Sequence, residues 1–184
     1  MKTIAILVSG SGSNLRTIAQ FCQSNPHLAR ASVVISNKLD AFGLEIAKEF
    51  AIPSVVIPTK GTTMAEFEAE IQKYLDGVDL ICLAGFMRVL TPEFTQKWHG
   101  KMVNIHPSLL PAFKGGNAVK DALNFGVKIT GCTVHFVEPE IDSGEIITQK
   151  AVEIQDEDTK EILHNRIKEA EKLAYTAALR ILCK

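Results

Sequence analysis

The sequence predicts an α/β fold, a single domain built on an open, mostly parallel, doubly wound sheet. Three observations support this prediction: apolar runs recur through the first hundred residues, helical periodicities lie between them, and the pattern changes after residue 128. Continuous apolar runs are typical of strands that helices cover on both faces. A chain of 184 residues suits one domain, so we assign residues 1–184 to it.

Five apolar runs are the expected strands of the parallel part of the sheet. They are Ile4–Val8, Ser32–Ile35, Ser54–Ile57, Leu80–Ala84 and Met102–Ile105. Apolar residues three and four positions apart predict helices between these strands. The helical stripes are Leu15, Ile18, Ala19 and Cys22, then Phe42, Ile46 and Phe50, then Met64, Phe67, Ile71, Tyr74 and Leu75. This alternation predicts right-handed βαβ crossovers, and Thr63 to Glu66 form a capping-box pattern before the third helix.

Beyond residue 128 the sequence predicts an antiparallel strand pair followed by a long C-terminal helix. The strands are Ile129–Val137 and Ile146–Ile154, joined by the polar loop Glu138–Glu145. The segment Asp158 to Glu161 offers an N-terminal cap for the helix. The apolar stripe of that helix is expected at Leu163, Ile167, Ala170, Ala174, Ala177 and Ile181.

Charge and composition exclude several classes of protein. The net charge is -1 with no long basic block, which argues against a nucleic-acid partner and a polybasic membrane anchor. The first apolar run is far shorter than the roughly 18 residues of a membrane span. The scattered cysteines form no C-x-x-C pair, so we expect buried thiols in a reducing, cytoplasmic compartment. Five histidines without an H-x-x-x-H pair predict no metal site.

A glycine-serine loop, Ser9 to Asn14, lies between the first strand and the first helix. Glycines allow close approach to a ligand, and the helix start offers free N–H groups, so Ser11, Gly12, Ser13 and Asn14 are a candidate phosphate cradle. The third glycine of a dinucleotide fingerprint is replaced by Leu15, and no Gly-Lys-Ser/Thr follows, which disfavours NAD and ATP. An ordinary glycine turn is the alternative.

Asn104 and His106 are the strongest candidates for chemistry. Two positions apart on a strand, their side chains are expected on the same face, at the carboxyl end where open α/β sheets bind ligands. An amide N–H can stabilise an oxyanion, and a histidine can carry a proton near neutral pH. A structural, hydrogen-bonded histidine is the alternative. His135 is expected to be a buried structural histidine, and His27 and His164 are expected in polar, exposed surroundings.

The acidic loop Glu138–Glu145 offers a carboxylate that could reach His106 and keep its ring charged. Asp142, before Ser143-Gly144, lies at the tightest bend, but composition alone does not choose it over Glu140. A solvated acidic turn is the alternative reading of this loop.

Five motifs in this order resemble the phosphoribosylglycinamide formyltransferases, folate-dependent enzymes of purine synthesis with a Rossmann-like fold, over nearly the whole chain. The motifs are Ser9 to Leu15, Leu83 to Arg88, Asn104 to Pro111, Gly131 to Val137 and Asp142 to Gly144. The resemblance implies that Asn104, His106 and Asp142 are catalytic and that the glycine loop holds the phosphate of glycinamide ribonucleotide. It also implies that Met87, Arg88, Val89 and Leu90 line the pterin site of 10-formyltetrahydrofolate, and that Glu171 lies near the ribose.

The resemblance has departures and rivals. Relatives can carry a basic residue near Met64 that meets the folate tail. None is present here, although Lys60 could substitute for it. The segment Ala112 to Asn117 and the early C-terminus also differ from those of relatives. Three other functions are possible on this pattern. Methionyl-tRNA formyltransferases need a further domain, and formyltetrahydrofolate hydrolases add an N-terminal regulatory segment. A catalytically silent phosphate-ligand sensor would not need all three catalytic residues. We therefore expect a cytoplasmic transferase with small-molecule substrates, as a monomer or homodimer.

Overall fold

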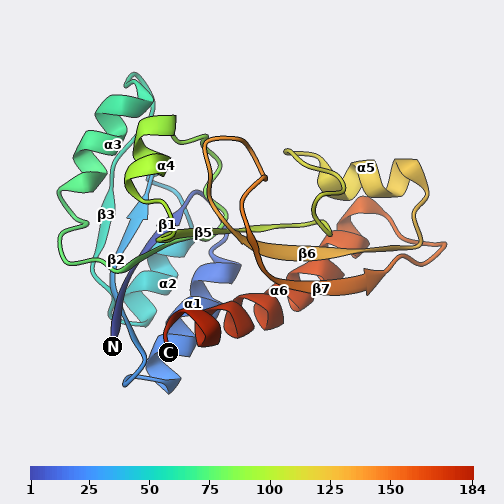
Figure 1. Cartoon of the computed structure of the whole chain (residues 1–184), viewed down its shortest axis with the longest axis horizontal. Helices are drawn as coiled ribbons and strands as arrows, with labels where there is room; N and C mark the ends of the chain where they lie inside the picture. The colour runs from blue at the N-terminus through green and yellow to red at the C-terminus, as the bar shows by residue number, and fades with distance from the viewer.

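The computed structural model describes residues 1–184, and its seven strands form one sheet. The strands are β1 (Lys2–Val8), β2 (Ala29–Ser36), β3 (Ser54–Val56), β4 (Leu80–Leu83), β5 (Met102–His106), β6 (Ile129–Phe136) and β7 (Ile146–Glu153). The helices are α1 (Ser13–Ser24), α2 (Gly43–Glu49), α3 (Met64–Gln72), α4 (Pro92–Lys97), α5 (Ala118–Phe125) and α6 (Lys160–Leu182). The strand order is β3-β2-β1-β4-β5-β6-β7 (Figure 1).

The sheet confirms the predicted fold class. Strands β1 to β5 pair in parallel, whereas β6 pairs antiparallel with both β5 and β7. Parallel strands place their carboxyl ends at one edge of a sheet. The loops that follow β1, β4 and β5 therefore meet at that edge, and β6 comes to lie beside β5 from the opposite direction.

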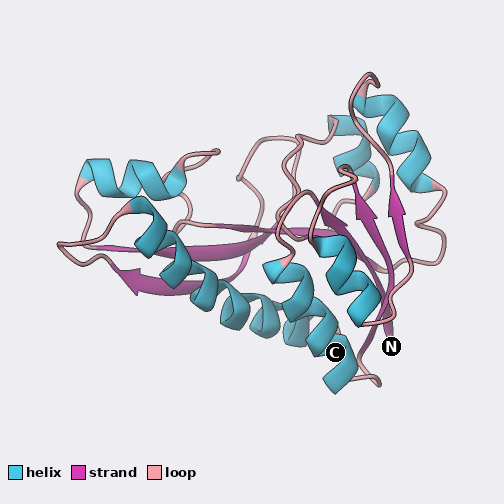
Figure 2. Ribbon diagram, turned by 180° about the vertical axis from the view of Figure 1, so that it is seen from behind, coloured by secondary structure: helices cyan, strands magenta, loops and turns pink.

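Two hydrophobic cores, one on each face of the sheet, explain the continuous apolar runs. In β1, Ile4 and Ile6 belong to the larger core of 27 residues, under α1, α2 and α6. The intervening Ala5 and Leu7 belong to the smaller core of 15 residues, under α3 and α4. Figure 2 shows α6 running along the β6–β7 pair and reaching α1. Both faces of the strand are buried, so hydrophobic residues are needed at every position.

The helix starts follow their capping residues. The Thr63 hydroxyl accepts a hydrogen bond from the Glu66 N–H, and the Glu66 carboxylate accepts from the Thr63 N–H, so the predicted capping box is confirmed. The Thr159 side chain caps α6 in a similar way, by accepting from the N–H of Ile162. Both helices therefore begin where the sequence indicates.

Parts of the predicted helical stripes are wrong. Ile181 is 53% exposed, and the buried residues at the end of α6 are Ala178 and Leu179. Phe42 and Tyr74 are also exposed, and each lies just outside the helix to which it was assigned. The short helices α4 and α5 have no counterpart in the sequence prediction.

The cysteines follow the prediction: all four are free thiols and buried. None of the helices combines the length with the apolar character that crossing a lipid bilayer requires.

Candidate active site

The end of β5 places Asn104 and His106 on the same face of the sheet. Val103 and Ile105 point into the larger core, while Met102 packs in the smaller core on the opposite face. Strand alternation therefore directs Asn104 and His106 to the side of Met102, as predicted. His106 is buried and Asn104 is half-buried, so the pair lies at the inner end of a cavity.

Both ring nitrogens of His106 have protein partners. Its Nδ1 lies 3.3 Å from Oδ2 of Asp142, and both side chains are almost completely buried. Its Nε2 lies 2.8 Å from the backbone oxygen of Phe113, to which an Nε2–H donates. A buried carboxylate beside an imidazole stabilises the charged form of the ring. The ring of His106 is thus held at two points.

The structure distinguishes Asp142 from Glu140, which the sequence alone does not. The side chain of Asp142 is 9% exposed and that of Glu140 is 80% exposed, with only Lys114 near it at 4.0 Å. Asp142 has a positive φ of 50°, and its Oδ2 accepts a hydrogen bond of 2.8 Å from the N–H of Gly115. A left-handed conformation is unfavourable for a non-glycine residue. The loop therefore turns sharply at the residue whose carboxylate meets His106.

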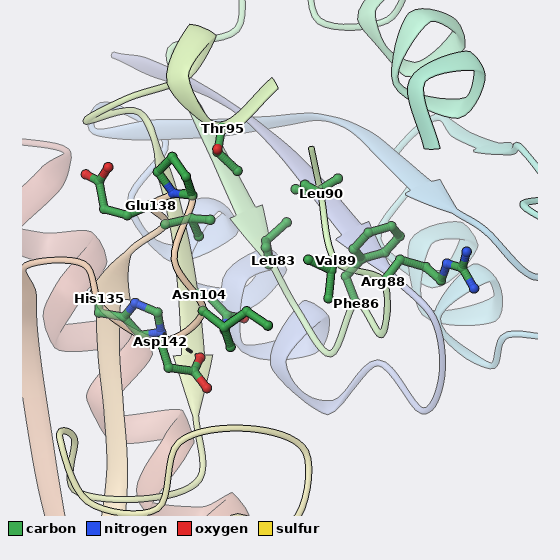
Figure 3. Close-up of a pocket in the computed structure, with 13 residues that line it drawn as sticks. Leu83, Phe86, Arg88, Val89, Leu90, Thr95, Asn104, His135, Glu138 and Asp142 are labelled. Atoms are coloured by element: carbon green, nitrogen blue, oxygen red, sulfur yellow. Dashed lines mark ion pairs between the residues drawn. The ribbon is translucent and has the colours of Figure 1, made fainter. Parts of the chain in front are cut away.

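His135 joins the site, although the sequence assigned it a purely structural role. It lies opposite Asn104 in the β5–β6 ladder, and its Nε2 is 3.7 Å from Oδ1 of Asp142 (Figure 3). Its Nδ1 lies 2.8 Å from the oxygen of Phe136. His135 is 2% exposed, and burial lowers the pKa of its ring below the usual value. Asp142 thus lies between two imidazoles.

Two hollows meet at this group of residues. The first, which we call the β4 pocket, has a volume of about 110 Å³ and contains Asn104, His135 and Asp142. Its other lining residues are Leu83, Phe86, Arg88, Val89, Leu90, Thr95, Val137, Glu138, Pro139 and Ile141. The second, which we call the α6 cleft, has a volume of about 410 Å³ and contains Asn104, His106 and Asp142. Asn104 and Asp142 border both, so two ligands could meet there.

The segment after β4 contributes to both hollows. Arg88, Val89 and Leu90 line the β4 pocket, whereas Met87 lines the α6 cleft and is 75% exposed. In Figure 3 the guanidinium group of Arg88 extends away from Asp142 toward the rim. Of the four residues predicted for the pterin, Arg88, Val89 and Leu90 therefore line the β4 pocket, whereas Met87 does not.

The α6 cleft also contains two residues of α6 that the sequence did not assign to the site. Lys160 and His164 line it opposite the segment Gly115–Val119. Burial, together with Lys168 and Lys160, lowers the pKa of His164. His164 is half-buried, so the expectation of an exposed residue is wrong. Its helical spacing from Lys160 and Lys168 was visible in the sequence, but only the fold shows that this face borders the cleft.

The glycine loop lies beside the α6 cleft rather than in its lining. Gly12 caps α1 with a positive φ of 72°, and a Cβ there would lie 2.8 Å from the Cα of Gly43. The Ser9 hydroxyl donates to Oδ1 of Asn37 at 2.7 Å and accepts from the N–H of Met87 at 2.9 Å. Only glycine fits this turn, and Ser9 fixes it to the segment that lines both hollows. The start of α1 offers free N–H groups, which can bind an anion.

Glu171 connects the C-terminal helix to the same loop. Its Oε2 accepts a hydrogen bond of 3.0 Å from Nδ2 of Asn14, and both residues are buried. Burial raises the pKa of Glu171 above the usual carboxyl value, although the bond from Asn14 acts in the opposite direction. Glu171 is thus bonded to the glycine loop, and that loop is bonded through Ser9 to Met87, which lines the α6 cleft.

The comparison with known families gives one match over nearly the whole chain. The family model described as formyl transferase matches residues 2–179. Phosphoribosylglycinamide formyltransferase from Haemophilus influenzae is 45% identical over 183 residues, which are 98% of this chain and 86% of that protein.

A second kind of relative is much longer. The trifunctional purine biosynthetic protein adenosine-3 from Gallus gallus is 47% identical over 182 residues, 97% of this chain. The chain spans only 18% of that protein's length.

A solved structure has the same fold. Glycinamide ribonucleotide transformylase 1 from Symbiobacterium toebii has a TM-score of 0.95 and 41% sequence identity. The match covers 100% of this chain and 88% of that one.

Proposed function

This chain belongs to the formyl transferase family, and on that premise we propose that it transfers the formyl group of 10-formyltetrahydrofolate to the amine of 5'-phosphoribosylglycinamide. The products are formylglycinamide ribonucleotide and tetrahydrofolate, in de novo purine biosynthesis. The full-length similarity to phosphoribosylglycinamide formyltransferases supports this substrate pair. The observation that carries the proposal is the meeting of two hollows at Asn104 and Asp142, because transfer requires two substrates to touch at one point.

The α6 cleft and the glycine loop suit a phosphorylated acceptor. Ser11, Gly12, Ser13 and Asn14 would hold the phosphate through side-chain donors and the free N–H groups at the start of α1. Glu171, bonded to Asn14, would accept a hydrogen bond from a ribose hydroxyl. The ribonucleotide would then extend along the cleft and bring its amine to the region between Asn104 and His106.

The β4 pocket suits the pterin of the formyl donor. Leu83, Phe86, Leu90 and Val137 give it apolar walls, as is usual for small-molecule sites. Arg88, Val89 and Leu90 would form the wall along which the pterin lies, and Met87 would lie beside it at the α6 cleft. The bound formyl-folate supplies the activated one-carbon group, so the protein needs no nucleophile of its own.

The catalytic roles follow from the charges around β5. Attack of the amine on the formyl carbon produces a tetrahedral oxyanion. The amide N–H of Asn104 and the charged ring of His106 would donate hydrogen bonds to that oxygen, and Asp142 would keep the ring protonated at 3.3 Å. The Nε2–H of His106, which donates to Phe113 here, would turn to the substrate. His106, or a water beside it, would then protonate the departing folate nitrogen.

The setting of the enzyme is part of the same proposal. We propose a cytoplasmic protein that acts as a monomer or homodimer on small molecules, without a nucleic acid or a metal ion. The four unpaired, buried cysteines are in keeping with a reducing compartment. The similarity to a segment of trifunctional proteins leaves the other activities of those proteins outside the proposal.

One experiment separates this function from its rivals. Purified protein is incubated with 10-formyltetrahydrofolate, and tetrahydrofolate is measured with and without glycinamide ribonucleotide. We expect turnover only when the ribonucleotide is present. Equal turnover without it would indicate a formyltetrahydrofolate hydrolase. Binding of the ribonucleotide without any turnover would indicate a catalytically silent sensor on the same fold.

A further inference from the structure

One nitrogen of His135 has no hydrogen-bond partner although it is buried. It is Nε2, and Thr130 Oγ1 is the one other buried side-chain atom in this state. The Nδ1 of His135 lies 2.8 Å from the backbone oxygen of Phe136. A carbonyl only accepts, so Nδ1 carries the hydrogen, and in the neutral ring Nε2 is left with a free lone pair. Such a group needs a donor.

The nearest polar atom to that lone pair cannot be the donor. Oδ1 of Asp142 lies 3.7 Å from Nε2, and an ionised carboxylate only accepts. Separations above about 3.5 Å between polar atoms point to a bridging water. A water that donates one hydrogen to each acceptor would satisfy both, and the β4 pocket, which both residues line, is the side from which it would enter.

The surroundings of His135 lower the pKa of its ring and so favour the neutral form. Asp142 on the β6–β7 loop raises the pKa of His135, whereas burial, the larger effect, and His106 on β5 lower it. Glu138 and Arg88 are the other charged residues that line the same pocket. The carboxylate of Asp142 thus lies beside the imidazoles of both His106 and His135, and a positive charge on one ring disfavours a positive charge on the other.

Formyl transfer needs a proton acceptor that the roles assigned above do not include. A bond forms between the amine nitrogen and the formyl carbon, and the bond from that carbon to the folate nitrogen breaks. The amine loses one proton and the folate nitrogen gains one, with no oxidation or reduction. His106 accounts for the proton that is gained. The proton that is lost requires a neutral base near the amine.

We propose that His135 accepts the proton of the attacking amine, through one water that bridges its Nε2 to Oδ1 of Asp142. This inference rests on the proposed function. As His106 gives its proton to the folate nitrogen, the repulsion that disfavours a charged His135 disappears. The positive charge moves from one side of Asp142 to the other, and the carboxylate has one charged neighbour throughout. Proton exchange with solvent then restores the resting state before the next turnover.

The test compares His135→Gln with the wild type. Glutamine can still bond the water but cannot take up a proton. We expect kcat to fall by about 10²-fold, in the lower range for general base catalysis. The KM values for both substrates should stay within about twofold of wild type. The decline of kcat at acid pH, which reports protonation of His135, should disappear. His27→Gln, on an exposed loop remote from the site, is the matched control and should behave as wild type.

The outcomes distinguish this inference from the proposed function. Wild-type protein without ribonucleotide-dependent turnover contradicts the function itself. An active wild type, with a His135→Gln variant that keeps its kcat and its acid limb, overturns only the role of His135. Should the variant not fold, nitrogen NMR of the wild-type imidazoles gives the answer. We expect His135 neutral at pH 7 with its hydrogen on Nδ1, and a doubly protonated ring at that pH would overturn the proposal.

Discussion

Nδ2 of Asn14 donates a hydrogen bond to Oε2 of Glu171 across 3.0 Å, and so joins residues 157 positions apart in the chain. The bond connects α1, which begins at the glycine loop, to α6, which runs along the antiparallel strands. Both partners are buried. The position of the glycine loop therefore depends on the C-terminal helix, and the charge of Glu171 affects both folding and ligand binding.

We expect Glu171→Gln to change the pH dependence of stability. Burial raises the pKa of Glu171, so the folded state holds this proton more tightly than the unfolded state. The resulting stability is fully present below the ordinary pKa of 4.5 and is lost as the pH rises through the raised value. Glutamine stays neutral and still accepts from Asn14. Urea unfolding from about pH 4 to pH 8 should show the variant gaining stability relative to wild type.

The control for that measurement is Glu169→Gln, which alters an exposed ion pair with Lys172 on the same helix. It should change stability little at any pH, because exposed pairs contribute about 0–1 kcal/mol. If the free energy of unfolding changed with pH in the same way for wild type and Glu171→Gln, ionisation of the buried carboxyl would not destabilise the folded state.

His106→Ala and Asp142→Asn should both lower kcat by about 10²–10³-fold, because each removes part of the charge that stabilises the oxyanion. The dissociation constant of the ribonucleotide, measured by calorimetry, should remain within about threefold, since its phosphate is bound by a different element. Glu140→Gln is the matched control, because its exposed side chain lies away from His106. A fully active Asp142→Asn together with a slow Glu140→Gln would reverse the assignment.

Asn104→Ala should slow the chemical step by a similar factor of about 10²–10³. Asn104 borders both the β4 pocket and the α6 cleft, where the formyl oxygen is expected. Single-turnover formyl transfer measures this step without product release. Asn165→Ala, on the exposed side of α6, is the control and should transfer at the wild-type rate. A normal single-turnover rate for Asn104→Ala would exclude the amide as an oxyanion donor.

Gly12→Ala should destabilise the protein by about 2 kcal/mol or more and weaken ribonucleotide binding. The residue has a φ of 72°, and its new Cβ would lie 2.8 Å from both Gly43 Cα and Ile46 Cδ1. A left-handed conformation costs about 1–2 kcal/mol for alanine, and overpacking adds about 1–3 kcal/mol. Gly10→Ala, where a Cβ meets nothing within 4 Å, should do neither. Thermal unfolding and calorimetry check both effects, and equal behaviour of the two variants would contradict the packing argument.

The sequence predicts the sheet and most helices because local patterns determine them. Continuous apolar runs identify each parallel strand, and Thr63 with Glu66 identifies the start of α3. The phase of α6 fails at one point, where Ala177 and Ala178 are adjacent. Because the two residues are identical, the sequence pattern does not show which of them faces the core, and in the structure Ala178 is the buried one. None of the predicted stripes covers α4, which buries Phe94 and Thr95, or α5, which buries Ala118, Val119 and Ala122.

The candidate site is predicted in part for the same reason. Asn104 and His106 are local to one strand, so their shared face follows from alternation. The place of Asp142 beside His106 depends on how a loop folds back over β5, which composition does not determine. His135 was read as structural because its relation to Asn104 depends on strand pairing across the β5–β6 ladder, a tertiary feature.

The β6–β7 ladder contains an irregularity between Val134 and His135, directly beside the site. A bulge turns the following side chain and increases the local twist of the strand. The extra residue is Ile147 on β7, so β6 itself keeps its alternation. Because neighbouring residues of a strand face opposite sides, loss of one residue of β6 just before His135 would send the imidazole into the larger core. Single-residue deletions in β6 should therefore inactivate the protein while leaving its hold on phosphate intact. Insertions in the connection between α1 and β2, residues 25–28, do not change which way the side chains of β6 point.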